Sequence, residues 1–427
     1  MVPANNFQSS DDGCADSSLL YWALFARRAT EEQIQAQRSQ TEQENAEIDR
    51  ANAESLQPPA RFLDRISNLF THPTPPYQTP TMEHKHPIAE ANETSPFGSL
   101  SPKQFYARHS VSHASEYITS KQGLKLFAQW WTPDQTPIKG YCIVCVVHGY
   151  TGESSWFVLL TSVHIAKHGF AVCAIDHMGH GYSEGLIAHL PDINLVVDEC
   201  ILFFNKFCSG YAPNLPAFLY AESLGGAIAL LITLRRDGVC PVRPFDGVVL
   251  NGAMYGISDK FKPPWPLEHF LSIAAALVPT WCVVPTRGSL PLVSFKVEWK
   301  RKLAVACPRR PLQRPRAATA QELLRVCREV QGQFNEVNVP FLIVHGGGDV
   351  VCDPACAERL YECAASKDKT LRIYPGMWHQ LVGEPDENVE LVFGEVVNWL
   401  VTRADQAAAG SVVEDVDAAA AAATEIK

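Results

Sequence analysis

Short apolar runs recur along the chain and alternate with longer segments of helical periodicity. Near-continuous apolar runs of this length are typical of strands buried in a parallel sheet. The runs are Tyr141–His148, Phe170–Asp176, Ala217–Glu222, Asp246–Asn251, Val339–His345 and Thr370–Tyr374, with Glu116–Thr119 and Leu124–Trp131 as opening strands.

Helical patterns occupy the intervals between these runs. They are Trp156–Lys167, Ile193–Cys208, Gly225–Arg235, Pro354–Cys363 and Asn388–Arg403. Strands that alternate with helices in this way predict an α/β fold. We expect a mostly parallel central sheet with helices on both faces.

One long stretch, residues 255–338, lacks the alternation. It contains several prolines, among them Pro263, Pro264 and Pro266, with apolar helix-like runs between them. Proline removes a backbone donor and interrupts regular structure. We therefore expect an inserted helical cap over the sheet.

Both ends of the chain differ in composition from the α/β domain, which we place at residues 101–403. Residues 1–100 are mostly polar and are expected to form a flexible extension. Residues 404–427 are rich in alanine and acidic residues without an apolar stripe, and are expected to be disordered.

Composition narrows the functional classes. Of 427 residues, 36 are Lys or Arg and 46 are Asp or Glu, which gives a net charge of −10. An acidic chain matches nucleic-acid phosphates poorly, so no nucleic-acid partner is expected. No apolar run reaches the roughly 18 residues of a membrane-spanning helix, and the polar start does not resemble a secretory signal.

The cysteines indicate the cellular compartment, and the absence of certain motifs indicates that no cofactor is bound. Many of the 13 cysteines lie inside apolar runs, which favours buried free thiols in a reducing compartment, the cytoplasm. Cys142 and Cys145 have no second pair at zinc spacing. With no phosphate-binding or dinucleotide-binding glycine motif either, we expect no metal and no cofactor.

The strongest chemical signal is the segment Phe218–Ala227. An apolar strand runs into Glu222-Ser223-Leu224, followed by two glycines and a helix. A serine on a tight strand-to-helix turn is presented as a nucleophile, and small residues on either side relieve crowding. Ala221 is the small residue two positions before Ser223, where glycine is the simplest pattern. Ser223 is the predicted nucleophile.

A serine nucleophile needs a base and an orienting acid. On a fold of this kind the acid and then the histidine follow the serine along the chain. Asp349 and His379 satisfy that order, and each comes just after a predicted strand, where sites on open α/β sheets form. Asp353 is a rival acid, but it precedes Pro354 and resembles a helix N-cap.

An oxyanion site requires two backbone N–H groups aimed at the reacting oxygen. The residue after the nucleophile, Leu224, supplies one. The loop His148–Gly152 after the first buried strand should supply the other, and we assign it to Tyr150.

These motifs resemble the monoacylglycerol lipase-like α/β-hydrolases. The segment Asp176–Gly185 matches their Asp-x-x-Gly-His-Gly-x-Ser-x-Gly loop, and the turn at Ser223 and the segments ending in Asp349 and His379 fit the same family. The plant branch, which includes caffeoylshikimate esterase-like enzymes, is most similar. The resemblance covers about residues 87–402.

The resemblance implies an α/β-hydrolase fold with Ser223, Asp349 and His379 as the triad. It also implies Tyr150 and Leu224 as oxyanion donors. The chain departs from the pattern at Ala221 and at Gly347–Gly348, where a polar residue and alanine are usual. It also carries an extension before Met82, which opens a segment similar to the family's usual N-terminus.

The implied activity is serine ester hydrolysis of a small-molecule acyl ester through an acyl-enzyme. A monoacylglycerol or lysophospholipid is the expected substrate. The alternatives are a phenolic ester such as caffeoylshikimate, acyl transfer to another acceptor, and a non-catalytic binding protein of the same fold.

Two features of the cap bear on partners. The apolar segment His269–Val278 suits an acyl tunnel or peripheral contact with a membrane, although packing on the sheet explains it equally. Residues 296–329 hold ten Lys or Arg and three Glu, a basic patch that suits an anionic lipid surface, a phosphate or a carboxylate. A solvated face is the simpler explanation.

Overall fold

The computed structural model describes residues 85–134, 142–235, 241, 244–262, 267–286 and 289–424, with the side chains of 267–269 and 408–424 left out. The expectations for residues 1–84, including Met82 as an alternative start, lie outside the described residues.

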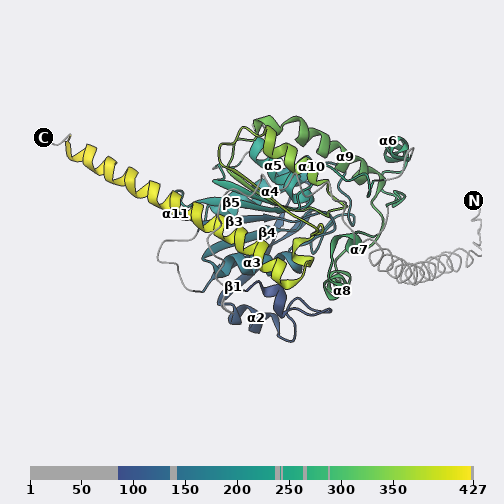
Figure 1. The fold of residues 1–427 in the computed structure, drawn as a ribbon, viewed down its shortest axis with the longest axis horizontal. Coiled ribbons are helices and arrows are strands. Elements are labelled where there is room, and N and C mark those ends of the chain that lie inside the picture. The colour runs from purple at the N-terminus through teal and green to yellow at the C-terminus, as the bar shows by residue number, and fades with distance from the viewer. Residues whose placement is uncertain are drawn as a thin grey trace, which may run out of the picture. The chain divides into compact units, whose positions relative to one another are not determined.

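The described residues form an eight-stranded sheet in the order β1-β2-β4-β3-β5-β6-β7-β8 (Figure 1). β2 is antiparallel to both β1 and β4, and the other neighbouring strands are parallel. The strands are β1 Val111–Thr119, β2 Lys125–Pro133, β3 Cys142–Val147, β4 Phe170–Ile175, β5 Ala217–Glu222, β6 Gly247–Asn251, β7 Phe341–Gly346 and β8 Lys369–Tyr374. The predicted strands and the mostly parallel sheet are confirmed.

Helices cover both faces of this sheet (Figure 1). One face packs against α4 (Ile193–Cys208), α5 (Leu224–Leu234), α9 (Ala317–Gly332) and α10 (Pro354–Cys363). The other face packs against α2 (Pro102–Arg108), α3 (Phe157–Lys167), α8 (Glu298–Ala306) and α11 (Asp386–Thr424).

Strand β5 shows why its sequence is apolar throughout. Leu219 and Ala221 belong to the core of the first face, and Phe218 and Tyr220 to that of the second. Successive side chains of a strand point to opposite faces, so a sheet covered twice needs apolar residues at every position.

The insertion lies between β6 and β7. It contains α6 (Leu267–Leu277), α7 (Leu290–Ser294), α8, α9 and the 3₁₀ turn η4 (Phe334–Glu336). Leu323 and Val326 of α9 pack in the same core as α5, so this end of the insertion belongs to the layer that covers the sheet.

Structured elements are present at both ends of the region assigned to the α/β domain. The 3₁₀ turn η3 (Pro87–Glu90) buries Ile88 in the core, so the folded part begins before residue 101. Helix α2, which we did not predict, starts with a capping box between Ser101 and Gln104. At the other end, α11 continues to Thr424 through the tail expected to be disordered, because alanine has the highest helix propensity.

The sequence also predicts buried free thiols and no membrane-spanning helix. Every cysteine within the described residues is a free thiol, and Cys145, Cys173 and Cys200 are buried. Across the described ranges, no helix combines the length and apolar character that a membrane crossing requires.

Substitution of Ile88 tests the packing of the segment before α2. Because Ile88 is fully buried, Ile88→Ala should lower the free energy of unfolding by about 2–5 kcal/mol in urea denaturation. The control is Leu391→Ala on α11, where the side chain is 45% exposed and the expected change is about 0.5 kcal/mol or less. Equal small effects would show that residues 87–90 do not contribute to the core.

Candidate active site

Ser223 lies in the turn between β5 and α5 with backbone angles φ 52° and ψ −121°. A non-glycine residue in this left-handed region is strained and must be held by its surroundings. The following helix is packed too tightly for larger residues. A Cβ on Gly225 would lie 2.2 Å from the Val147 carbonyl oxygen, and one on Gly226 would lie 2.2 Å from Ala253 Cβ. The predicted crowding around the serine is confirmed.

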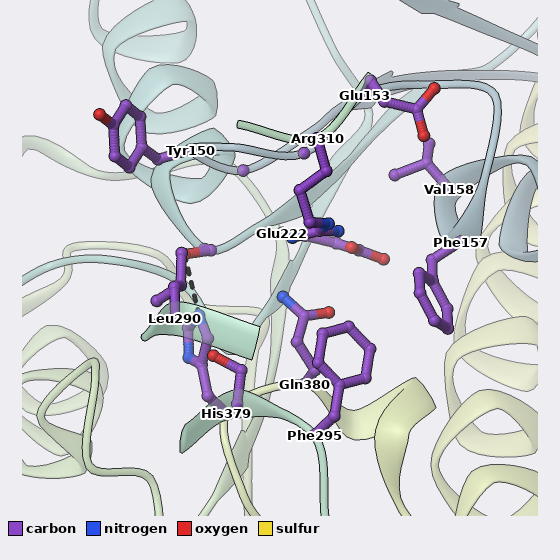
Figure 2. Close-up of a pocket in the computed structure, with 14 residues that line it drawn as sticks. Tyr150, Glu153, Phe157, Val158, Glu222, Leu290, Phe295, Arg310, His379 and Gln380 are labelled. Atoms are coloured by element: carbon purple, nitrogen blue, oxygen red, sulfur yellow. Dashed lines mark hydrogen bonds between the residues drawn. The ribbon is translucent and has the colours of Figure 1, made fainter. Parts of the chain in front are cut away.

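Three side chains from separate loops meet at the carboxyl edge of the sheet. Ser223 follows β5, Asp349 follows β7 and His379 follows β8. The Ser223 Oγ–His379 Nε2 distance is 3.0 Å (Figure 2), and the His379 Nδ1–Asp349 Oδ2 distance is 2.7 Å. The structure therefore brings together the three residues selected from the sequence, in the order serine, histidine, acid.

The Asp349 carboxylate is held from several sides. Its Oδ1 accepts hydrogen bonds from the backbone N–H groups of Val351 and Cys352, at 2.7 and 2.9 Å. The buried His345, at the end of β7, places Nε2 3.2 Å from Asp349 Oδ2. Burial tends to raise the pKa of Asp349, but the interactions with His379 and His345 outweigh it and keep the pKa below its ordinary value. The acid is therefore ionised and fixed in orientation.

His345 is a site residue that the sequence analysis missed. It precedes Asp349 along the chain, and the structure places it beside the acid. The spacing His345-Gly-Gly-Gly-Asp349 indicates this contact, since a turn after a strand can bring residues four positions apart together.

The loop after β3 lies against the nucleophile. A Cβ on Gly149 would be 2.9 Å from Ser223 Cβ and 3.2 Å from the Glu222 carbonyl oxygen. Tyr150 lines the pocket beside Ser223, while its hydroxyl donates to the Ala188 carbonyl at 3.3 Å. Leu224 opens helix α5 directly after Ser223. Tyr150 and Leu224 thus flank the serine, and their assignment as oxyanion donors stays a prediction.

Two buried histidines, His148 and His177, are hydrogen-bonded to each other where the β3 loop begins. The His177 backbone N–H donates to His148 Nε2, and His177 Nε2 donates to the His148 carbonyl, both at 3.0 Å. Burial lowers the pKa of His177 to about 3 and that of His148 well below its usual value, so both rings are neutral at pH 7. The neutral pair fixes the backbone that leads into Gly149.

The glycine-rich segment Asp176–Gly185 is folded around the Asp176 carboxylate. Its oxygens accept from the backbone N–H groups of Ser154 at 2.7 Å and Tyr182 at 2.9 Å. A Cβ on Gly181 would lie 2.1 Å from Asp176 Oδ2, which explains glycine at that position. The motif therefore shapes the loops around the site instead of supplying a reactive group.

A pocket beside Ser223 combines polar and apolar side chains (Figure 2). Glu222 accepts a hydrogen bond from the Tyr220 hydroxyl at 2.8 Å, and burial raises the pKa of Glu222. Burial and the nearby Asp176 raise the pKa of Glu153 to about 8. The pocket is lined by Glu153, Glu222, Arg310 and Gln380 together with Phe157, Val158, Leu290 and Phe295. Arg310 belongs to the basic patch of residues 296–329 noted in the sequence, whereas the inward position of the other side chains was not predicted.

The rival acid Asp353 and two other histidines lie elsewhere in the fold. Asp353 caps α10, where its side chain accepts from the Ala355 N–H at 3.1 Å, as predicted. His164 is buried on α3, and His168 ends that helix and contacts the His164 carbonyl. None of these three residues lines the pocket beside Ser223.

Asp349, Cys352 and His379 have potential ligand atoms within 4.8 Å of one another. The direct 2.7 Å contact between Asp349 and His379 occupies the space that an ion would need. Hydrogen bonding therefore accounts for the cluster, and nothing in its geometry requires a metal.

The sheet, the nucleophile turn and the hydrogen-bonded serine, histidine and acid define a serine hydrolase of the α/β-hydrolase fold. Comparison with known proteins agrees. The profile of the family described as serine aminopeptidase, S33, matches residues 140–386. The chain therefore belongs to this family, and is a monoglyceride lipase-like member of it.

Two relatives illustrate the similarity. Caffeoylshikimate esterase of Arabidopsis thaliana is 33% identical over 306 residues, covering 71% of this chain and 90% of the relative. Human monoglyceride lipase is 29% identical over 298 residues, covering 69% and 93%. In structure, a soluble variant of monoglyceride lipase from Saccharomyces cerevisiae superposes with a TM-score of 0.57 at 16% identity, over 68% of this chain and 95% of that one. This last likeness concerns the fold.

The close contact of Gly149 with the nucleophile gives a test of the β3 loop. Gly149→Ala should displace the loop from Ser223 and lower ester turnover by about 10²–10³-fold, the usual cost of a lost oxyanion donor. Gly394→Ala on α11 is the matched control, because beyond the neighbouring backbone of α11 no atom lies within 4 Å of the added Cβ. Near-normal turnover by Gly149→Ala, measured on a p-nitrophenyl ester, would contradict a role for this loop.

Proposed function

We propose that the protein is a serine ester hydrolase that works through an acyl-enzyme. The observation that carries this is the chain of hydrogen bonds from Ser223 through His379 to Asp349 at a strained strand-to-helix turn. Ser223 Oγ attacks the ester carbonyl, and His379 Nε2 accepts the proton of the serine hydroxyl. Asp349 holds the other ring nitrogen and stabilises the imidazolium that forms.

In this proposal the backbone N–H groups of Leu224 and Tyr150 stabilise the oxyanion of the tetrahedral intermediate. His379 then returns the proton to the leaving alcohol, and the acyl group remains on Ser223. Water next attacks the acyl-enzyme with His379 again as the base. Hydrolysis releases the acid and restores the serine.

A monoacylglycerol or a lysophospholipid is our first candidate substrate. Relatives named monoglyceride lipase, from human and mouse, support the lipid class. The alternative is a phenolic ester, supported by the 33% identity to the Arabidopsis caffeoylshikimate esterase. Acyl transfer needs the same acyl-enzyme and differs only in the acceptor.

Removal of the nucleophile tests the activity. Ser223→Ala should lower turnover by about 10³-fold or more on whichever ester the wild type hydrolyses. A panel of a p-nitrophenyl ester, a monoacylglycerol, a lysophospholipid and caffeoylshikimate identifies the preferred class. A folded wild type that is inert on all four would contradict hydrolysis and favour an acyltransferase or a non-catalytic binding protein.

We further propose that the cap contacts a lipid surface through α6. Phe270, Ile273 and Leu277 are 57%, 55% and 76% exposed and fall on one side of the helix. Trp281, just beyond the helix, is 62% exposed. An exposed apolar patch of this kind suits docking on the membrane that holds a lipid substrate.

The triple change Phe270→Ser, Ile273→Ser and Leu277→Ser should reduce co-sedimentation with phosphatidylcholine vesicles by at least about tenfold, since each side chain contributes about 1.5–3 kcal/mol when buried. The control is Leu202→Ser with Leu391→Ser, at exposed apolar positions on α4 and α11. Equal binding by the triple variant and the wild type would rule out docking through α6.

A further inference from the structure

A cationic side chain from the insertion reaches into the pocket beside the nucleophile. Arg310 lies in the segment between α8 and α9 and lines the same pocket as Ser223 and His379. Its side chain points toward Glu222 (Figure 2). Two other arginines of this segment are engaged elsewhere. Arg309 lies over the Tyr182 ring at 4.6 Å, and Arg316 Nε donates to the Ile187 carbonyl at 2.8 Å.

The Arg310 guanidinium has weak partners. One Nη donates to Thr151 Oγ1 at 3.5 Å, and the Phe295 ring centroid lies 5.9 Å away. Its Nε is buried without a hydrogen-bond partner. Within the described ranges, no carboxylate lies within ion-pair distance of Arg310. A guanidinium offers five donors, so most of its binding capacity is left for another group.

Two buried carboxyl groups, Glu153 and Glu222, lie near Arg310, and neither forms an ion pair with it. Burial and the nearby Asp176 raise the pKa of Glu153 to about 8, which favours the neutral form of this side chain. Glu222 accepts from Tyr220 and also has a raised pKa, because it is buried. Cys307, which also interacts electrostatically with Arg310, has a pKa raised by burial to about 12 and is neutral.

The character of the pocket indicates which part of an ester occupies it. Glu153, Glu222, Arg310 and Gln380 would lose water without gaining hydrogen bonds if an acyl chain lay against them. A polar alcohol part with hydroxyl groups would replace the lost water contacts. The pocket therefore suits the alcohol side of the scissile ester.

We propose that Arg310 is a specificity-determining residue that binds an anionic group, a carboxylate or a phosphate, on the alcohol part of the substrate. Planar guanidinium donors match both anions in two-point contacts. This inference rests on the proposed ester hydrolysis and narrows it. Lysophospholipids and shikimate esters carry such an anion, whereas a monoacylglycerol does not.

Two matched ester pairs test the proposal. One pair is 1-oleoylglycerol and 1-oleoylglycerol 3-phosphate, and the other is caffeoylshikimate methyl ester and caffeoylshikimate. The ratio of kcat/KM for the charged over the neutral member is the readout, so the pairs also distinguish phosphate from carboxylate. Arg310→Met should lower that ratio about 10- to 100-fold, the usual weight of a charged hydrogen bond, mainly through KM.

Two further variants make the result specific. Arg310→Lys keeps the charge without the planar donors and should retain part of the preference. Arg309→Met removes a neighbouring cation that faces Tyr182 and should leave the ratio unchanged. Equal losses on both members of each pair would assign Arg310 a packing role and overturn the proposal.

A binding measurement separates this inference from the hydrolase assignment. Glycerol 3-phosphate and shikimate should bind the Ser223→Ala protein in calorimetry at least about tenfold more tightly than they bind Ser223→Ala with Arg310→Met. Glycerol, which has no charge, should show no such difference. Anions that bind both proteins equally would overturn the proposal. Anion binding that depends on Arg310, in a protein inert on every ester, would contradict only the hydrolase assignment.

Discussion

The strained, left-handed backbone of Ser223 is held in place by chain segments that pack closely around it. Glycines in these segments make the close packing possible. Gly225 allows α5 to approach the end of β3, Gly226 allows contact with Ala253, and Gly149 brings the β3 loop against the serine. A single methyl group at any of these positions would collide with its neighbours. The nucleophile is therefore positioned by steric exclusion from several sides, and the loops of the site are arranged around it.

The sheet supplies the second requirement, which is to bring distant residues together. Ser223 and His379 are 156 positions apart and are hydrogen-bonded because β5 and β8 end at the same edge of the sheet. Asp349 reaches His379 from β7, the strand beside β8. Parallel strands present their carboxyl ends together, so each reactive group needs only a short loop to reach the common site.

Most strands and helices and the choice of the acid could be predicted from the sequence, because buried elements leave a regular pattern of apolar residues. Strand β5 and helices α4 and α10 have the predicted bounds, and the assignment of Asp349 over Asp353 follows from the helix-capping signal before Pro354. The inward direction of Arg310 could not be predicted. It lies in an irregular segment where no periodicity tells which way a side chain points. The stretch beyond residue 404 lacks an apolar stripe, so burial leaves no pattern there, and only its alanine content favours a helix.

The insertion is attached to both cores that flank the sheet. Leu303 of α8 packs in one core, and the Trp156 indole donates to its carbonyl at 2.8 Å, while Leu323 of α9 packs in the other core. Helices α8 and α9 are thus part of the stable body of the domain, and the segment between them carries Arg310 into the pocket beside the nucleophile. Sequence change in that stretch can alter which esters are accepted without disturbing the folding nucleus or the nucleophile. A family built this way can diversify its substrates while its chemistry stays constant.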